Sequence, residues 1–376
     1  MDHVLLSVTI TLALVGLVMV FSASAVVAGN RFDDSGYFLK RQLAWLTFGF
    51  LLLHLASRID YIWWKRLTIP LLGLMIVLLV MVLIPSLGVA AKGARRWLRL
   101  GAISGQPAEM AKLIAVIYLA AYLTKKEDRL TIFSSGLLPA LIVVGVLSGL
   151  ALLEPDLGTA VVLGLVTMGL LFLAGARISH LLGLGLCLAP VALALVLGSS
   201  YRRQRLMTFL APWKDASDAG FQITQSFLAF GSGGPFGVGL GEGKQKLYFL
   251  PEAHTDFVLA LVGEELGLVG TGAIILLFAL FVVRGFQIAS RARMPFGRYL
   301  GMGITLLIGI QALVNACVVT GLMPTKGLTL PFVSYGGSSL VVSLVGVGIL
   351  LNISRDRRAG REETRHRSDR GGLGRR

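Results

Sequence analysis

Long apolar stretches separated by polar connections follow one another along the chain from Leu5 to Leu351. An α-helix needs about 20 mostly apolar residues to cross the hydrocarbon core of a membrane, and ten stretches meet or approach that length. They predict an all-α polytopic membrane protein with ten transmembrane helices. The predicted spans are residues 4–28, 43–57, 67–87, 108–124, 133–153, 157–175, 179–198, 254–283, 299–321 and 332–352.

The connection between the seventh and eighth spans, residues 199–253, is the longest in the chain. We therefore predict one membrane domain over residues 1–353, with this loop as its main element outside the bilayer. Residues 354–376 form a tail that is rich in Arg, Gly, Ser and acidic residues and has no apolar periodicity. Such a composition is typical of a disordered segment.

The composition is typical of a membrane protein, and in such a protein a positive net charge does not indicate nucleic-acid binding. Hydrophobic residues make up 55% of the chain and charged residues 15%, well below the roughly 25% of soluble domains. A formal net charge of +15 would suggest nucleic-acid binding in a soluble protein. Here nine arginines fall in the tail, where anionic lipid head groups attract them, so we expect no nucleic-acid partner.

The distribution of basic residues predicts the orientation. An even number of spans puts both termini on one side of the membrane. If that side is the cytoplasm, twenty of the 35 Lys and Arg residues lie inside, fourteen lie outside and Lys112 lies within a span. This distribution follows the positive-inside rule, so we predict that both termini are cytoplasmic.

The outer basic residues form clusters. Arg95 and Arg96, with Lys92 and Arg99, crowd the loop between the third and fourth spans, and residues 202–205 open the long loop with three arginines. Phosphates of outer-leaflet lipids would explain any one of these residues. A polyanionic head group explains clusters in two separate loops better, because guanidinium groups match the geometry of phosphate.

Glu109 and Lys112 lie at the start of the fourth span, three residues apart and therefore on one face of the helix. An ionisable group at the membrane centre costs roughly 2.5–3.5 kcal/mol, which makes it a candidate for function. The alternative is a structural ion pair that fixes two helices together. Under either interpretation we expect the pair to face the interior of the protein.

Two further acidic residues, Glu154 and Asp156, flank Pro155 in a very short outer turn between the fifth and sixth spans. Proline accounts for the turn and not for the two carboxylates. They either form a salt bridge with a neighbouring outer loop or help to position a basic or metal-bridged group of a substrate. The residues themselves leave both interpretations open.

Asp256 is predicted at the first turn of the eighth span, at the boundary between water and hydrocarbon. Partial loss of water there would raise the pKa of its carboxyl and suit it to work as a general base. If Asp256 instead caps the helix, the helix dipole would lower that pKa. Glu264 lies eight residues further, about 12 Å along a helix, and is expected to pack among the spans.

Several sequence blocks, in order along the chain, resemble those of the SEDS family, the bacterial shape, elongation, division and sporulation proteins. The most extensive is GLMPTKGLTLPFVSYGGSSL at residues 321–340. The others are GARRWL at 93–98, QPAEMAK at 106–112, EPDLGT at 154–159, LPEAHTDF at 250–257 and GEELG at 263–267. The resemblance covers all ten predicted spans and excludes only the tail.

The resemblance implies a glycosyltransferase that polymerises lipid II, a disaccharide-pentapeptide on undecaprenyl pyrophosphate, at the outer face of the bacterial cytoplasmic membrane. It implies that Asp256 is the catalytic carboxylate that takes the proton of the acceptor hydroxyl. Arginines and a divalent cation, Mg²⁺ or Mn²⁺ with ligands that stay unknown, would stabilise the departing pyrophosphate. The candidate substrate-binding residues are Arg95, Arg96, Glu109, Lys112, Glu154, Asp156, Lys326 and Ser338.

The resemblance also implies partners and a location. The expected partners are lipid II, a cognate class B penicillin-binding protein of the FtsI-like transpeptidase type, and other membrane proteins of the divisome. Pro324 to Gly327, the serines Ser338 and Ser339, and the pair before His254 are more similar to division and sporulation members than to the elongation, RodA-type polymerase. We therefore expect the protein at the division septum.

Two other classes of function remain as alternatives. A flippase or transporter of lipid II would use charges within the spans to line a pathway for the head group. The unusual charges, however, gather almost entirely on the outer side, whereas a transporter needs polar groups through to the other face. A purely structural scaffold of the divisome would leave Asp256 and the outer arginines without a task.

Overall fold

The structure is a computed structural model. It describes residues 1–372 except 92–93, 101–102, 216–219, 248, 252 and 326. Side chains are described as far as Arg355, apart from a few loop positions. The predicted disordered tail therefore lies almost entirely outside the described side chains, and its prediction stays open.

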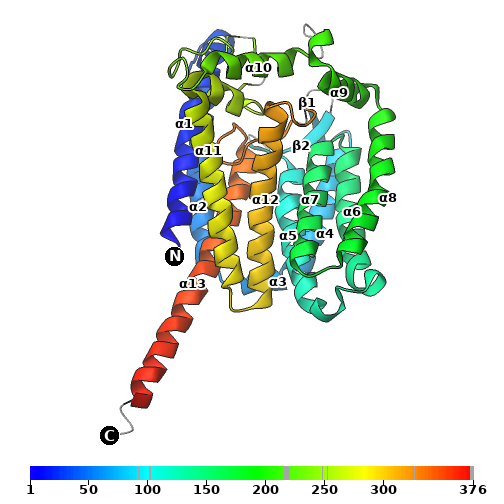
Figure 1. Cartoon of the computed structure of the whole chain (residues 1–376), viewed down its shortest axis with the longest axis vertical. Coiled ribbons are helices and arrows are strands. Elements are labelled where there is room, and N and C mark those ends of the chain that lie inside the picture. Colours follow the sequence, from blue (N-terminus) through cyan, green and yellow to red (C-terminus); the bar gives the residue numbers. More distant parts are fainter. Residues whose placement is uncertain are drawn as a thin grey trace.

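Helices run side by side through most of the molecule, as Figure 1 shows. The ten long ones are α1 (His3–Phe32), α2 (Tyr37–Arg58), α4 (Thr68–Leu83), α5 (Pro107–Lys125), α6 (Leu138–Leu153), α7 (Leu157–Leu173), α8 (Ile178–Leu197), α11 (Val258–Ser290), α12 (Pro295–Val319) and α13 (Gly337–Gly372). The short ones are α3 (Ile62–Arg66), α9 (Ser200–Leu210), α10 (Phe221–Gly233) and the single turns Glu127–Arg129, Phe133–Leu137 and Pro212–Asp215.

Each of the ten predicted spans overlaps one of the long helices, which confirms the polytopic helical fold. Within the described residues, seven helices are long and apolar enough to cross a membrane. Helices α4 and α7 are apolar but have 16 and 17 residues, and α2 carries charged residues near its ends. The count of ten crossings therefore stays a prediction.

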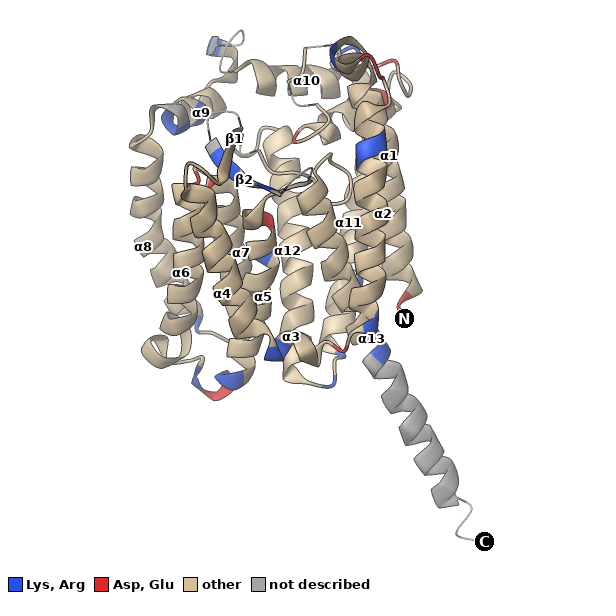
Figure 2. Cartoon of the chain, turned by 180° about the vertical axis from the view of Figure 1, so that it is seen from behind, with Lys and Arg blue, Asp and Glu red and all other residues tan. Residues whose placement is uncertain are grey.

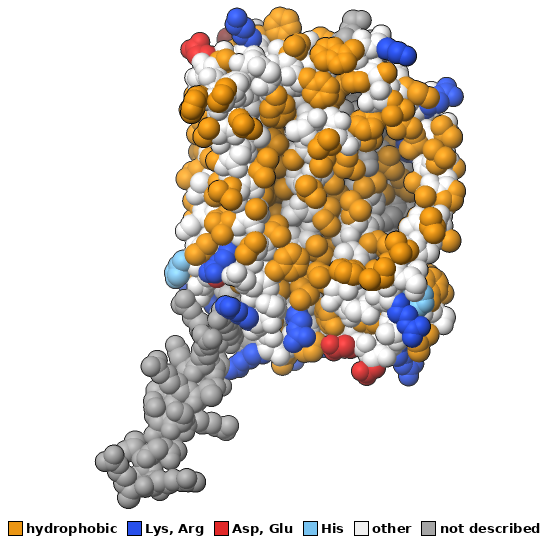
Figure 3. All heavy atoms as spheres, in the orientation of Figure 1, with side chains coloured by type: hydrophobic (Ala, Val, Ile, Leu, Met, Phe, Trp, Pro, Cys, Tyr) orange, Lys and Arg blue, Asp and Glu red, His pale blue; other side chains and the backbone are white. Residues whose placement is uncertain are grey.

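The surface of the bundle is apolar around its middle. Figure 3 shows hydrophobic side chains over the central part of one face and basic side chains near both ends. Helix α8 is the extreme case, because Leu181 is its only buried residue and Figure 1 shows it at the edge of the bundle. An apolar belt between two polar ends is what a bilayer requires of a spanning protein.

Small residues bring the helices together inside the bundle. A Cβ atom on Gly49 of α2 would meet the Leu344 side chain of α13 at 2.5 Å, and one on Gly285 of α11 would meet Thr305 of α12 at 2.3 Å. Glycines at such positions let neighbouring helix backbones approach closely, as in other membrane bundles. The bundle core is thus fixed by shape as well as by apolarity.

The start of the chain and the part of α13 near Ser354 meet at one end of the bundle, where the Asp2 backbone N–H donates to Ser354 Oγ at 3.1 Å. The opposite end carries the long loop, with α9 and α10 lying across it in Figure 1. We call this opposite end the outer end, following the predicted orientation. The predicted loop of residues 199–253 thus contains two helices and a turn rather than irregular chain alone.

A small antiparallel sheet at the outer end was absent from the sequence prediction. Strands β1 (Gly88–Ala91), β2 (Ala94–Leu100) and β3 (Ile103–Gly105) lie between α4 and α5 in the order β1-β2-β3. In β2, Arg95 pairs with Ala90 and Leu98 pairs with both Gly88 and Gly105. The sheet gives three residues of the predicted basic cluster, Arg95, Arg96 and Arg99, a defined backbone, while Lys92 lies outside the described residues.

Helix α11 is broken near its outer end by Gly267, whose φ of 67° is left-handed. A Cβ atom on Gly267 would lie 2.4 Å from the backbone nitrogen of Gly237, so only glycine permits this contact. The glycine-rich end of the long loop therefore packs directly into the break in α11.

Candidate functional site

The charged residues of the described chain gather at the two ends of the bundle, and a few lie inside it, as Figure 2 shows. The predicted site residues that the structure describes belong to the outer end and to the helix starts just beneath it. They come from β2, the start of α5, the turn between α6 and α7, the segment before α11 and the start of α13. Five parts of the chain that are distant in sequence therefore contribute to one end of the molecule.

Asp256 lies in a turn before α11 and is half-buried. Helix α11 begins at Val258 with Phe257 at its N-cap, so Asp256 lies one residue before the cap position rather than in the first helical turn. Its carboxylate lies against Gly327, where a Cβ atom would be 3.2 Å from Asp256 Oδ2. Gly327 has a left-handed φ of 58°, which favours glycine there.

The chain after α12 runs without regular secondary structure for most of its course to α13, and side chains of α12 hold it. Asn315 Nδ2 donates to the backbone oxygens of Leu328 at 2.6 Å and Asp256 at 2.8 Å. One turn earlier, Gln311 Nε2 donates to the Thr329 oxygen at 3.3 Å. The sequence analysis missed both amides, although two amide side chains four residues apart in an apolar span are a visible signal.

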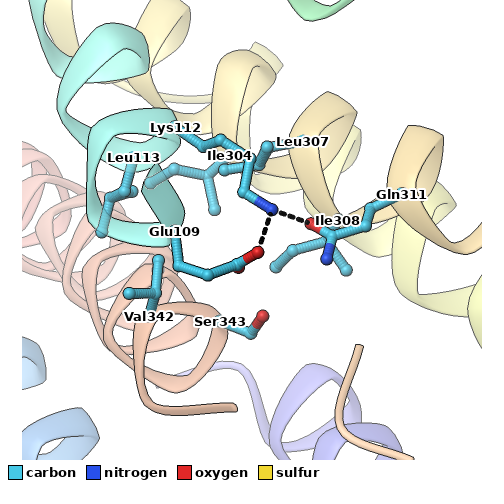
Figure 4. Close-up of a pocket in the computed structure, with 10 residues that line it drawn as sticks. Glu109, Lys112, Leu113, Ile304, Leu307, Ile308, Gln311, Val342 and Ser343 are labelled. Atoms are coloured by element: carbon cyan, nitrogen blue, oxygen red, sulfur yellow. Dashed lines mark hydrogen bonds and ion pairs between the residues drawn. The ribbon is translucent and has the colours of Figure 1, made fainter. Parts of the chain in front are cut away.

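Glu109 and Lys112 form an ion pair inside the bundle, with 2.8 Å between Glu109 Oε1 and Lys112 Nζ. Lys112 Nζ also donates to Gln311 Oε1 at 3.2 Å, and Figure 4 shows both contacts converging on the lysine nitrogen. The Lys112 side chain is 1% exposed, which confirms that the pair faces the interior. A small cavity beside the pair, lined also by Leu307 and Ser343, is no larger than a single water.

Arg96 reaches the turn between α6 and α7, so the two outer loops are in contact. It does not form the salt bridge considered from the sequence, because it binds backbone oxygens rather than carboxylates. Its Nε donates to the Glu154 oxygen at 3.1 Å and its Nη2 donates to the Pro155 oxygen. Asp156 instead caps α7 by accepting from the Thr159 N–H at 3.0 Å and the Thr159 hydroxyl at 2.9 Å. Its role as a helix cap was not foreseen.

The Glu154 side chain is completely buried, and neither carboxyl oxygen has a hydrogen-bond partner among the described residues. Loss of water on burial raises the pKa of Glu154 from 4.5 to about 8. Within this value, the neighbouring charge of Asp156 also raises the pKa of Glu154, while Arg96 lowers it. Glu154 is therefore mostly protonated at neutral pH.

The remaining predicted residues are placed as follows. Arg95 is exposed on β2. Ser338, at the start of α13, accepts from the backbone N–H of Gln106 at 3.1 Å, and Gln106 Nε2 donates to Asp156 Oδ2 at 3.2 Å. Gln106 thus joins two predicted site residues that are far apart in sequence. Lys326 lies outside the described residues.

The described residues contain no group of three or more His, Cys, Asp and Glu side chains that would hold a metal ion. Mg²⁺ is often bound by one or two carboxylates, several waters and the phosphates of a substrate. The divalent cation and its ligands therefore stay a prediction.

Glu264 and Glu265 of α11 hold the long loop. Glu264 Oε1 accepts from the Lys244 N–H at 2.8 Å, so Glu264 binds loop backbone rather than only packing among the spans. Glu265 Oε1 lies 2.7 Å from Lys246 Nζ and accepts from the Ser22 hydroxyl at 2.7 Å. These contacts join α1, α11 and the long loop next to the break at Gly267.

Known proteins match this chain over the region of the ten long helices. Residues 2–359 match the model of the cell cycle protein family of FtsW, RodA and SpoVE. A probable peptidoglycan glycosyltransferase FtsW of Geobacter sulfurreducens is 50% identical over 94% of this chain and 95% of that protein. The stage V sporulation protein E of Bacillus subtilis is 44% identical over 94% of this chain and 97% of its own length.

Solved structures show the same fold. A chain from a peptidoglycan synthase complex, described as coordinating polymerization and crosslinking, matches with a TM-score of 0.78 and 32% identity over 95% of this chain and 98% of that one. The rod shape determining protein RodA of Thermus thermophilus matches with a TM-score of 0.69 and 31% identity over 95% and 97% of the two chains.

Proposed function

The chain belongs to the FtsW, RodA and SpoVE family of cell cycle proteins, and we propose that Asp256 is the base with which it polymerises lipid II. Its relatives identify the chain as an integral membrane protein and a peptidoglycan glycosyltransferase. The observation that carries the proposal is the half-buried Asp256 carboxylate, held at the outer end against Gly327.

The reaction joins two lipid-linked sugars. The acceptor hydroxyl oxygen forms a bond to the anomeric carbon of the donor, and the bond from that carbon to the lipid pyrophosphate breaks. The acceptor proton passes to the Asp256 carboxylate, which is half-buried at the outer end. The pyrophosphate leaves with the electron pair of the broken bond, so positive groups are needed beside it.

Arg95 and Arg96 are proposed for different tasks. Arg96 already donates two hydrogen bonds to backbone oxygens of the turn at residues 154–155. Arg95 is exposed on the same strand, so we assign the pyrophosphate to Arg95 and the shaping of the turn to Arg96. A divalent cation, Mg²⁺ or Mn²⁺, would neutralise further negative charge of the leaving group when bound.

Glu109 and Lys112 are proposed to form the floor of the substrate site. The cavity beside them is too small for a sugar ring. In this conformation the pair therefore acts on the site through Gln311, which holds the chain at Thr329. Lys326 is proposed to contact the head group beside Gly327, and Ser338 to hold the start of α13 against α5.

The solved peptidoglycan synthase complex supports a crosslinking partner for this chain. We propose a class B penicillin-binding protein of the FtsI type, together with other divisome membrane proteins. The FtsW relatives support a role in septal synthesis over the elongation role. The proposed location is the septal part of the bacterial inner membrane, with both termini in the cytoplasm.

The decisive experiment replaces Asp256 by Asn in the full chain, purified with its transpeptidase partner and assayed with lipid II and Mg²⁺ or Mn²⁺. Loss of the base should reduce glycan synthesis at least about 100-fold while the complex still assembles. The matched control is Asp34→Asn, which removes an outer-end carboxylate that pairs with Lys40 at 2.9 Å. It should polymerise at the unmodified rate.

A fully active Asp256→Asn variant would exclude Asp256 as the base. If the unmodified protein moved lipid II across vesicle membranes and made no glycan, the transporter alternative would replace the polymerase.

A further inference from the structure

Two irregular segments meet at the proposed site, residues 254–257 before α11 and residues 327–330 before α13. Neither segment is part of a helix or a sheet, and α11 begins directly after the first one. Buried backbone carbonyls need hydrogen-bond donors, and loops without regular structure must find them in side chains. The identity of those donors therefore shows what holds Asp256 in place.

One side chain serves both segments. Asn315, on α12, is 1% exposed, and its amide nitrogen donates to Asp256 O at 2.8 Å and to Leu328 O at 2.6 Å. A side-chain amide has two N–H groups, so this pair of acceptors uses its full donor capacity. The backbone of Asp256 and the backbone of residue 328 are thus fixed to each other through a single rigid group.

This bridge also determines what the Asp256 carboxylate faces. Gly327 precedes the residue that Asn315 holds, and the position of a Cβ on Gly327 lies 3.2 Å from Asp256 Oδ2. The Asn315 amide therefore fixes both the backbone of Asp256 and the backbone next to Gly327, which forms the wall beside the Asp256 carboxylate. A shift of either segment would change the distance between the carboxylate and a substrate bound over Gly327.

The same helix holds the next residue of the loop. Gln311, one turn before Asn315, donates to Thr329 O at 3.3 Å and to Ser339 Oγ at 3.3 Å, and it accepts from Lys112. Asn315 differs from Gln311 because only Asn315 contacts Asp256 among these hydrogen bonds. The two amides hold successive residues of the loop, and one of them also holds the proposed base.

We infer that Asn315 is a positioning residue for the transfer reaction, which sets the Asp256 carboxylate against the wall formed by Gly327. The inference rests on the proposed role of Asp256. Asn315 is buried behind the two segments and acts through Asp256 rather than on the substrate. Its contribution is therefore to the rate of the bound complex and not to the binding of lipid II.

The test uses Asn315→Ala in the full chain with its partner, with kcat and KM for lipid II measured separately. Misplacement of the base by a fraction of an ångström to an ångström should lower kcat about 10- to 100-fold, while KM stays within about twofold. Thermal unfolding in detergent is recorded for the same samples, because a merely structural residue would lower stability without this selective loss.

The chain provides a matched control in Asn352 of α13. Its Nδ2 donates to Ser57 O at 3.1 Å and its Oδ1 accepts from the Tyr61 N–H at 2.9 Å. Asn352 therefore also holds irregular backbone, in the connection between α2 and α3, at the opposite end of the molecule. Asn352→Ala should lower the unfolding temperature to a similar degree and leave kcat of the folded protein unchanged.

A double variant separates positioning from general damage. Asp256→Glu moves the carboxylate by one methylene, so Asn315→Ala should cost much less in that background than in the unmodified protein. Independent effects would instead multiply. If Asn315→Ala does not fold, Gly327→Ala displaces the same carboxylate from its other side and should give the same selective loss of kcat.

The outcomes distinguish the two proposals. Full activity of Asp256→Asn contradicts the proposed base and, with it, the role of Asn315. An inactive Asp256→Asn together with unchanged kcat in folded Asn315→Ala overturns only the positioning role. The positioning role is also overturned if the kcat losses of Asn315→Ala and Asp256→Glu simply multiply in the double variant. The same holds if Asn315→Ala and Asn352→Ala lower kcat equally.

Discussion

Two fully buried glutamates near the outer end have opposite surroundings. Glu265 of α11 lies 2.7 Å from Lys246 Nζ, and its two carboxylate oxygens share the proton of the Ser22 hydroxyl, at 2.7 and 2.8 Å. Glu154, at the end of α6, has no hydrogen-bond partner for its carboxyl among the described residues. Both side chains are 0% exposed, so burial alone does not explain the difference.

The contrast shows two uses of a buried carboxylate. The partners of Glu265 come from α1 and from the long loop, so its charge joins three parts of the chain. The Glu154 carboxyl bonds to none of the described residues, and burial raises its pKa to about 8. The first carboxylate is a fixed support for the loop, and the second can gain or lose its charge near neutral pH.

Removal of the cation beside Glu265 should have the largest effect. Lys246→Met leaves a buried carboxylate without its ion partner and should lower the free energy of unfolding by about 3–5 kcal/mol. Unfolding in detergent measures the change. The control is Lys40→Met, which breaks the pair with Asp34, where the Lys40 side chain is 73% exposed. Equal shifts in the two variants would show that the Lys246 pair does not support the fold.

A change at Glu154 should alter the pH dependence of stability instead. Because its pKa is raised from 4.5 to about 8 on folding, the folded protein binds more protons than the unfolded chain within that window. Stability therefore falls as the pH rises from 4.5 to about 8, and one proton limits the slope to about 1.4 kcal/mol per pH unit.

Glu154→Gln should remove this contribution, so the variant gains stability over the unmodified protein as the pH rises through the window. Unfolding measured from pH 5 to pH 9 on both proteins tests the sign. Parallel curves for the two proteins would mean that Glu154 is not protonated when buried.

The smallest effect is expected at Asp156, which borders Glu154 and caps α7. Asp156→Ala removes the acceptor for the Thr159 N–H and should lower stability by about 1 kcal/mol. Asp156→Asn keeps a capping oxygen but removes the charge that raises the pKa of Glu154, so it should preserve stability and shift the pH dependence to lower pH. If both variants lose the same stability, Asp156 does not stabilise the protein by capping α7.

The ten helices could be predicted from sequence because apolarity and length are local properties. The inward direction of the Glu109–Lys112 pair was equally accessible, since three residues make most of a helical turn and charges avoid lipid. Helix ends were less accurate. The eighth span was predicted from residue 254, whereas α11 begins at Val258, because polar residues of the preceding turn follow the loop.

The contacts within the site depend on distant parts of the chain. A salt bridge between the turn at residues 154–156 and a neighbouring outer loop was one of two interpretations, but sequence spacing does not show that Arg96 binds backbone oxygens of this turn. The outer sheet was missed because its short strands carry no long apolar run. Asn315 lies within a predicted span, and only the fold brings Asp256 and residue 328 to the same amide.

The break in α11 implies an order of events when the protein is made. The glycine-rich part of the long loop is synthesised before α11, yet its place is a gap that exists only after Gly267 has broken that helix. Gly237 and Gly267 can therefore meet only after α11 has been synthesised with its break. A side chain at either position should first reduce the amount of membrane-inserted protein that matures, before any change in the turnover of the molecules that do.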